Sequence, residues 1–251
     1  MACNRCLLHR AIRQGDDKSV LRLLQTVDAK HINLSKDSLL SSAVRLKSMK
    51  MVQLLLDQGA NPDRREGKFY PIHLAVIEGS LDIFKLLVRN GGNLDRRTIF
   101  GCHSIHLAAD YGRIEFLEYL LKMRVDINLI DGDDCSPLYR AVVRGRTNVV
   151  AYLIELNADV NKVDILGDSP LHLSVEFGFK EIIDLLINNG ARIDQKNFSG
   201  WTPLHYATSC SHFEILKHLH EAGAKYVISE KRKHSKRTEA EVERDEGFSL
   251  E

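Results

Sequence analysis

The sequence predicts an all-α solenoid of stacked helix-loop-helix repeats. One observation is a short apolar pattern that returns along the chain at a spacing of 32 or 33 residues. A second is that an apolar stretch with helical spacing, and then a turn, follow the pattern at a fixed distance. Repetition at a period of about 20 to 50 residues is typical of solenoids, in which each repeat buries its apolar face on its neighbours. The central residues of the seven copies are Leu8, Leu40, Ile72, Ile105, Leu138, Leu171 and Leu204.

Each copy is expected to begin with a first helix around its central residue. The strings that form this helix read LLHRA, YPIHLA, HSIHLA, SPLYRA, SPLHLS and TPLHYA. The string LLSSA departs most from the shared pattern. The first helix is expected to end at a glycine, because the residue just past a helix end often adopts positive φ. The glycines in that position are Gly15, Gly79, Gly112, Gly145 and Gly178.

A second helix is expected in each copy, followed by an extended hairpin loop. Strings such as MVQLLLDQGANPD, VVAYLIELNADVN and IIDLLINNGARID have apolar residues at helical spacing. Copies four and five have Arg124 and Asn157 where other copies have a glycine. If copy four ends like its neighbours, Arg124 takes a left-handed conformation that costs on the order of 1 kcal/mol. The glycines at this second turn are Gly59, Gly91, Gly190 and Gly223.

These strings resemble the signature T-P-L-H-x-A of the ankyrin-repeat family at its period of about 33 residues. The resemblance covers residues 4 to 228. It implies a stack of repeats with β-hairpin loops, and a partner surface formed by the hairpin tips and the solvent side of the first helices.

Two domains are expected: an ankyrin-repeat domain over residues 1–228 and a charged tail over 229–251. The first and last repeats of a stack should be polar on their outer side. In copy seven, His218 and His220 stand where other copies have leucine or isoleucine, so residues 212–223 are interpreted as a C-terminal cap. The tail has few apolar residues and is expected to be disordered.

Composition argues against several classes of function. The formal net charge is +1, so no strong field attracts nucleic acid to the repeat domain. No apolar run approaches the length of a membrane span, and no signal segment is evident, so a soluble intracellular protein is expected, cytoplasmic with the nucleus left open. The cysteines number five and should be free thiols in that compartment, Cys102 and Cys135 included.

Motifs for catalysis or metal binding are weak. The chain has no P-loop, no G-x-S-x-G turn and no H-E-x-x-H helix, so we expect neither enzymatic activity nor a cofactor. Two clusters offer three potential metal ligands each. A structural zinc site requires four ligands, so no metal is expected. Histidine recurs at one position of the repeat, where the family resemblance implies a structural role. The two clusters are Cys3, Cys6, His9 and Cys102, His103, His106; the recurring histidines are His9, His73, His106, His172 and His205.

Function is therefore expected to come from a surface. Apolar and aromatic residues occupy positions that should face water by their place in the repeat, and exposed apolar patches mark partner sites. The alternative is that some of these side chains pack on neighbouring hairpins. Acidic residues of the later copies, such as Asp110, Asp131 and Asp168, are expected to give that face a negative end. The predicted partner-binding residues are Phe69, Ile77, Ile99, Phe100, Tyr111, Ile165, Leu166, Phe177, Phe198 and Trp201.

Three functions remain open. The first is a monomeric, non-catalytic adaptor that holds a protein partner, with no direct contact to nucleic acid and no membrane insertion. The second is the substrate-recognition subunit of a ubiquitin ligase, and the third is a nuclear regulator that masks a transcription factor. The basic tail cluster Lys231, Arg232, Lys233, Lys236 and Arg237 is a nuclear-import signal, a contact for an acidic partner, or a solvated charged segment. Asn128 and Asn161 resemble asparagines that are hydroxylated in some ankyrin proteins.

Overall fold

The computed structural model describes residues 4–24 and 39–225. These ranges hold fourteen helices, arranged as seven consecutive pairs, and no β-strand. The predicted all-α repeat fold is confirmed. The chain divides into two compact units, Met1–Pro137 and Leu138–Glu251, and the boundary lies at the start of one first helix. The division into a repeat domain over 1–228 and a tail over 229–251 stays a prediction.

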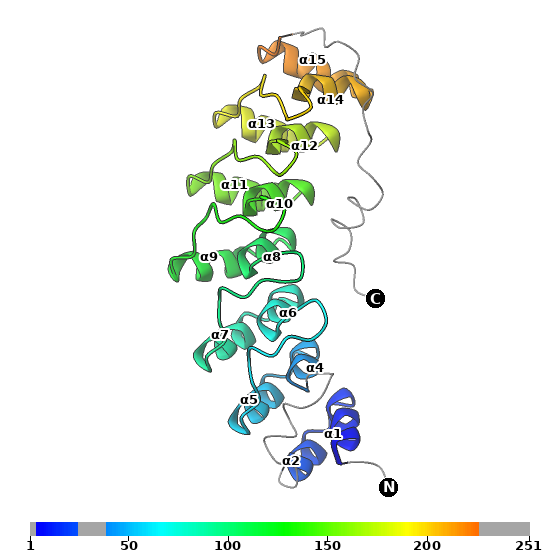
Figure 1. The fold of residues 1–251 in the computed structure, drawn as a ribbon, viewed down its shortest axis with the longest axis vertical. Helices are drawn as coiled ribbons and strands as arrows, with labels where there is room; N and C mark the ends of the chain where they lie inside the picture. Colours follow the sequence, from blue (N-terminus) through cyan, green and yellow to red (C-terminus); the bar gives the residue numbers. More distant parts are fainter. Residues whose placement is uncertain (1–3, 25–38, 226–251) are drawn as a thin grey trace. The chain divides into compact units, whose positions relative to one another are not determined.

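Within each unit the first helices of successive pairs lie in one layer and the second helices in another (Figure 1). The first unit contains α1 (Asn4–Arg13), α2 (Asp17–Leu24), α4 (Leu39–Arg45), α5 (Met49–Asp57), α6 (Pro71–Glu78), α7 (Leu81–Arg89), α8 (Ser104–Asp110) and α9 (Ile114–Lys122). The second unit contains α10 (Pro137–Val143), α11 (Thr147–Glu155), α12 (Pro170–Glu176), α13 (Lys180–Asn188), α14 (Pro203–Ser209) and α15 (Phe213–Glu221).

The helical spacing of apolar residues places them between successive pairs. In α7, Ile83, Phe84 and Leu87 are buried on one face of the helix. The Phe84 ring meets the ring of Phe116 from the next second helix edge-on, at 5.4 Å between centroids. Full burial of such a side chain contributes about 1.5–3 kcal/mol, so each pair is stabilised mainly by its neighbours.

The turns after the second helices have the predicted left-handed residue. Gly190 has a φ of 88°, and Arg124 and Asn157 adopt the same region with φ values of 63° and 62°. Copy four therefore ends like its neighbours despite the arginine. Because a side chain with a Cβ is disfavoured at positive φ, Arg124 carries a local strain that the glycine copies avoid.

The hairpin loops are closed by the side chain of their first residue. Asp164 Oδ1 accepts hydrogen bonds from the backbone N–H groups of Leu166 and Asp168, at 2.9 and 2.8 Å. Asn197 Oδ1 does the same for Ser199 and Trp201, at 3.0 and 2.9 Å. One isolated antiparallel bridge, Glu66 with Phe69, occurs in the described ranges. Short polar side chains are well suited to this role because they mimic a backbone turn.

His73, His106 and His172 have the structural role that was predicted for the recurring histidines. His73 Nδ1 accepts the backbone N–H of Tyr70 at 3.3 Å, and His73 Nε2 lies 3.0 Å from the carbonyl oxygen of Arg96 in the following loop. His172 makes the equivalent contacts with Ser169 and with the carbonyl of Trp201. Each imidazole therefore joins its own helix start to the next hairpin.

The last helix pair has the polar residues expected of a cap. His218 Nε2 lies 2.5 Å from Asp184 Oδ1 of the preceding second helix, and His220 is exposed. Ile215 and Leu219 form the buried face of α15. The tail that follows, with the basic cluster, lies outside the described residues.

Candidate functional site

Two neighbouring hairpins of the second unit expose apolar side chains. Ile165 and Leu166 are 48% and 38% exposed at one tip, and Phe198 is 78% exposed at the next. The backbone N–H of Phe198 donates to the carbonyl oxygen of Leu166 at 3.0 Å, which joins the two tips directly. We call these three residues the apolar hairpin surface. The structure thus brings together three of the predicted partner-binding residues.

Gly167 makes room for this contact. It has a φ of +80°, and a Cβ built on it would lie 2.7 Å from Phe198 N and 2.8 Å from Phe198 Cδ1. Real Cβ atoms do not approach other atoms so closely, so any side chain here would displace Phe198. Glycine is required at this point for both its conformation and its size.

A buried carboxylate fixes the second hairpin beside the first. Asp168 is 2% exposed and accepts hydrogen bonds at 2.9 Å from Asn197 Nδ2 and from the Tyr206 hydroxyl. Asn197 begins the hairpin that carries Phe198, and Tyr206 belongs to α14. Because a buried charge must be well paired to be tolerated, this network holds the two hairpins in one arrangement.

Asp164, at the base of the first hairpin, is also buried. Its Oδ2 accepts the Tyr139 hydroxyl at 2.5 Å. Burial raises the pKa of Asp164, and the hydrogen bond from Tyr139 acts in the opposite direction. The aspartates of this hairpin serve its geometry and are not presented to a partner.

Two further predicted residues lie in the same unit. Phe177 is exposed at the end of α12, and its ring lies 5.8 Å from that of Phe179. Trp201 is half-buried, with its ring centroid 5.8 Å from those of both His205 and Tyr206. Trp201 therefore packs on its own helix α14, whereas the alternative interpretation expected packing on a neighbouring hairpin.

The first unit has a smaller apolar region on its hairpins. Ile99 is exposed at a tip, and its N–H lies 3.4 Å from the carbonyl oxygen of Lys68. The ammonium group of Lys68 lies 5.5 Å from the centroid of the Phe100 ring, which is half-buried. Phe69 and Tyr111 are also half-buried. These rings present only part of their surface to solvent.

The prediction that Ile77 faces water is wrong. Its side chain is 4% exposed. Arg113 of the next helix pair reaches the end of α6, where its Nη2 donates to the Ile77 carbonyl oxygen at 3.2 Å. The repeat pattern alone does not predict the burial of Ile77.

Three of the acids expected to give the partner surface a negative end do not lie on the surface, whereas Asp134 is exposed. Asp110, Asp131 and Asp168 are buried. Asp131 Oδ1 accepts the backbone N–H groups of Asp133 and Cys135 within its own hairpin. Asp131 and Asp168 are therefore engaged in hydrogen bonds within the hairpins and are not presented to a partner.

Phe213 is an exposed aromatic that the sequence interpretation missed. It is 74% exposed at the start of α15, inside the segment interpreted as a polar cap. Its apolar character in that segment was the available signal. It lies on a helix and not on a hairpin, which makes it a useful reference for Phe198.

The histidines of one potential metal cluster make contacts within the fold. His106 Nδ1 accepts the N–H of His103, and His106 Nε2 lies 2.9 Å from the carbonyl of Leu129. Across residues 4–24 and 39–225, no group of three or more His, Cys, Asp and Glu side chains is arranged to hold a metal ion. Cys3 of the other cluster lies outside the described residues. In the same ranges, no helix has both the length and the apolar character needed to span a bilayer.

Comparison with protein families identifies the family of the chain. A family model for ankyrin repeats, in three copies, matches residues 8–98, 72–164 and 156–230. The chain belongs to the ankyrin-repeat family, whose repeats are generally protein–protein interaction modules. No individual curated protein matches the chain.

Proposed function

We propose that this protein is a non-catalytic adaptor that binds a protein partner through the apolar hairpin surface of its second unit. The observation that carries the proposal is the exposure of Ile165, Leu166 and Phe198 on two hydrogen-bonded hairpin tips. Apolar side chains that fold stability does not need are favoured at surfaces that a partner covers. Phe177 extends the proposed contact onto the end of a first helix.

The rigidity of the tips supports the same role. Asp168, Asn197 and Tyr206 hold the hairpins in place before a partner arrives. A preorganised surface loses less conformational entropy on binding than a flexible loop. Aromatic anchors in such surfaces contribute about 2 kcal/mol each or more, which corresponds to about a 30-fold change in affinity.

The test is quantitative co-purification of partners with the full-length chain. Wild type is compared with a variant carrying Ile165→Ala, Leu166→Ala and Phe198→Ala together. Because these side chains are exposed, circular dichroism and the unfolding transition should change little. The partners that depend on this surface should be lost from the triple variant.

Phe213→Ala is the matched control. Phe213 and Phe198 are the same residue type, in the same unit, with 74% and 78% of their surface exposed. A general effect of removing exposed apolar surface would reduce capture in both variants. Equal recovery of every partner by wild type and the triple variant would exclude the proposed surface.

A further inference from the structure

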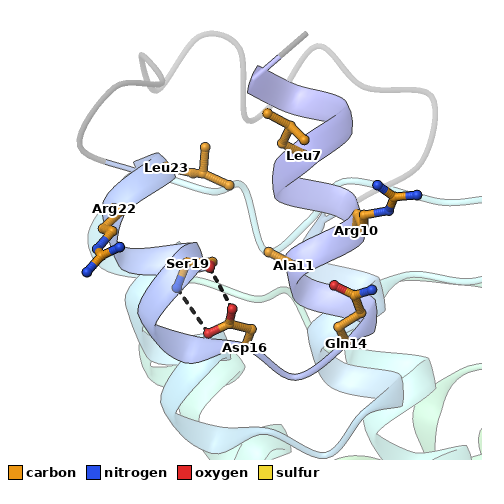
Figure 2. A pocket seen from close by; sticks show the side chains of 8 residues that line it. All are labelled: Leu7, Arg10, Ala11, Gln14, Asp16, Ser19, Arg22 and Leu23. Atoms are coloured by element: carbon orange, nitrogen blue, oxygen red, sulfur yellow. Dashed lines mark hydrogen bonds between the residues drawn. The ribbon is translucent and has the colours of Figure 1, made fainter. Parts of the chain in front are cut away.

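A groove lies between α1 and α2 of the first unit. It is open to solvent, has a volume of about 330 Å³, and is lined by side chains of both helices and of the turn between them. Figure 2 shows Leu7 and Leu23 facing each other across the space between the helices, with Ala11 between them. In the same view the guanidinium groups of Arg10 and Arg22 point outward, on the opposite outer sides of α1 and α2.

The helical period of α1 explains the groove. Leu7, Arg10, Ala11 and Gln14 follow the spacing i, i+3, i+4, i+7, which places them on one face. Leu8 and Ile12 belong to a neighbouring face and are fully buried in the core. The groove face of the helix is mixed: Arg10 and Gln14 are polar, Ala11 is 5% exposed, and Leu7 is the apolar side chain that remains accessible, at 36%.

The charged residues around the groove favour an anionic ligand. Arg10 and Arg22 are exposed. The acid among the lining residues is Asp16, which accepts hydrogen bonds from Ser19 N at 3.2 Å and from Ser19 Oγ at 2.5 Å. These bonds lower the pKa of Asp16 and hold its carboxylate at the start of α2. Asp16 thus remains a carboxylate at the start of α2, and the lining has two arginines against this one acid.

We propose that this groove binds an acidic peptide segment that also carries apolar side chains. An apolar side chain of the peptide covers Leu7, Ala11 and Leu23, while its carboxylates pair with Arg10 and Arg22. The apolar floor distinguishes this ligand from an anion such as phosphate or a nucleic-acid backbone. A second copy of the same groove is a poor fit, because Arg10 and Arg22 would then oppose like charges. This site is separate from the apolar hairpin surface and does not depend on the function proposed for it.

The experiment measures binding of a fluorescein-labelled probe peptide to the full-length chain by fluorescence polarisation. In the probe, leucines recur at helical spacing among glutamates. Two matched peptides replace all glutamates with glutamine, or all leucines with serine. The wild-type chain should bind the probe and bind both matched peptides at least about tenfold more weakly.

The protein variants locate the binding. The double variant Arg10→Glu and Arg22→Glu should weaken probe binding about tenfold or more, and Leu7→Ser should also weaken it. Arg13→Glu is the matched control, because Arg13 is an exposed arginine of α1 outside the lining of the groove. All three variants change exposed side chains, and their circular dichroism should match wild type.

Several outcomes would overturn the inference. Undetectable binding of the probe by wild type, or equal losses in Arg13→Glu and the double variant, would remove the groove as the site. Strong binding of the serine peptide or of single-stranded DNA would show a general anion site. Dimerisation that Leu7→Ser abolishes, seen by sedimentation, would make a second copy the occupant. The alanine variant of the apolar hairpin surface should bind the probe normally, so failure of one proposal leaves the other open to its own test.

Discussion

Alanine at Gly167 should destabilise the protein more than alanine at Gly200, although the two glycines occupy the same position of neighbouring hairpins. Both have a φ of +80°. A Cβ at Gly167 would lie 2.7 Å from Phe198 N, whereas a Cβ at Gly200 would meet nothing within 4 Å. The pair therefore separates the steric contribution of Phe198 from backbone strain.

The expected free energies follow from these contacts. Each alanine adds about 1–2 kcal/mol of left-handed strain, and the lower entropy of the unfolded alanine chain offsets about 0.4–1 kcal/mol of it. At Gly167 the overcrowding with Phe198 adds about 1–3 kcal/mol. With an m-value of about 2 kcal/mol/M in urea, the midpoint of Gly167→Ala should lie about 1 M below that of Gly200→Ala.

Urea unfolding followed by circular dichroism and by the fluorescence of Trp201, the one tryptophan of the chain, measures this difference. Trp201 lies in the hairpin that begins at Asn197, so its emission reports on the affected region. Gly167→Ala should also reduce partner capture, because it displaces Phe198, whereas Gly200→Ala should not. Equal midpoints for the two variants would refute the close approach of the hairpins.

Three further predictions concern stability. Arg124→Gly should raise the free energy of unfolding by up to about 1 kcal/mol, and the urea midpoint with it, since the change relieves positive-φ strain. An unchanged or lower midpoint would argue against that strain. Ser169→Ala should lose about 0.5–2 kcal/mol, because the Ser169 hydroxyl caps α12, and a wild-type midpoint would show that the cap is dispensable. Burial lowers the pKa of His73 from 6.5 to about 4, so the unfolded chain binds a proton first as pH falls. The free energy of unfolding should therefore drop by up to about 3 kcal/mol between pH 6.5 and pH 4. The unfolding free energy of His73→Gln should depend less on pH over that range. Parallel profiles of unfolding free energy against pH for the variant and wild type would contradict the assignment to His73.

Local features of the fold could be predicted from the sequence because they repeat. The spacing of the central leucines and isoleucines predicts the helix pairs, and alignment of the turns predicts the left-handed Arg124. The histidine beside each helix start was assigned a structural role, which the bonds of His73 and His172 confirm. The second bond of each imidazole, to the next hairpin, depends on the stacking distance and is not visible in the sequence.

The surface was harder to predict because non-local contacts decide which side chains are exposed. Ile77 is buried in the region that Arg113 reaches from the following helix pair. Asp168 is withdrawn from the surface by Tyr206, a residue of the next repeat. The groove between α1 and α2 is lined by apolar and polar residues of both helices, which the repeat pattern does not single out.

The most direct test of the adaptor role is photo-crosslinking from the apolar hairpin surface. The full-length chain carries p-benzoylphenylalanine in place of Phe198, and a control carries it in place of Phe213, which is similarly exposed on α15. After irradiation in cells, the Phe198 position should give a discrete set of protein adducts that Ile165→Ala with Leu166→Ala reduces. The control should not give those adducts. Identical adducts from both positions, or none from the Phe198 position, would contradict a partner site on the apolar hairpin surface.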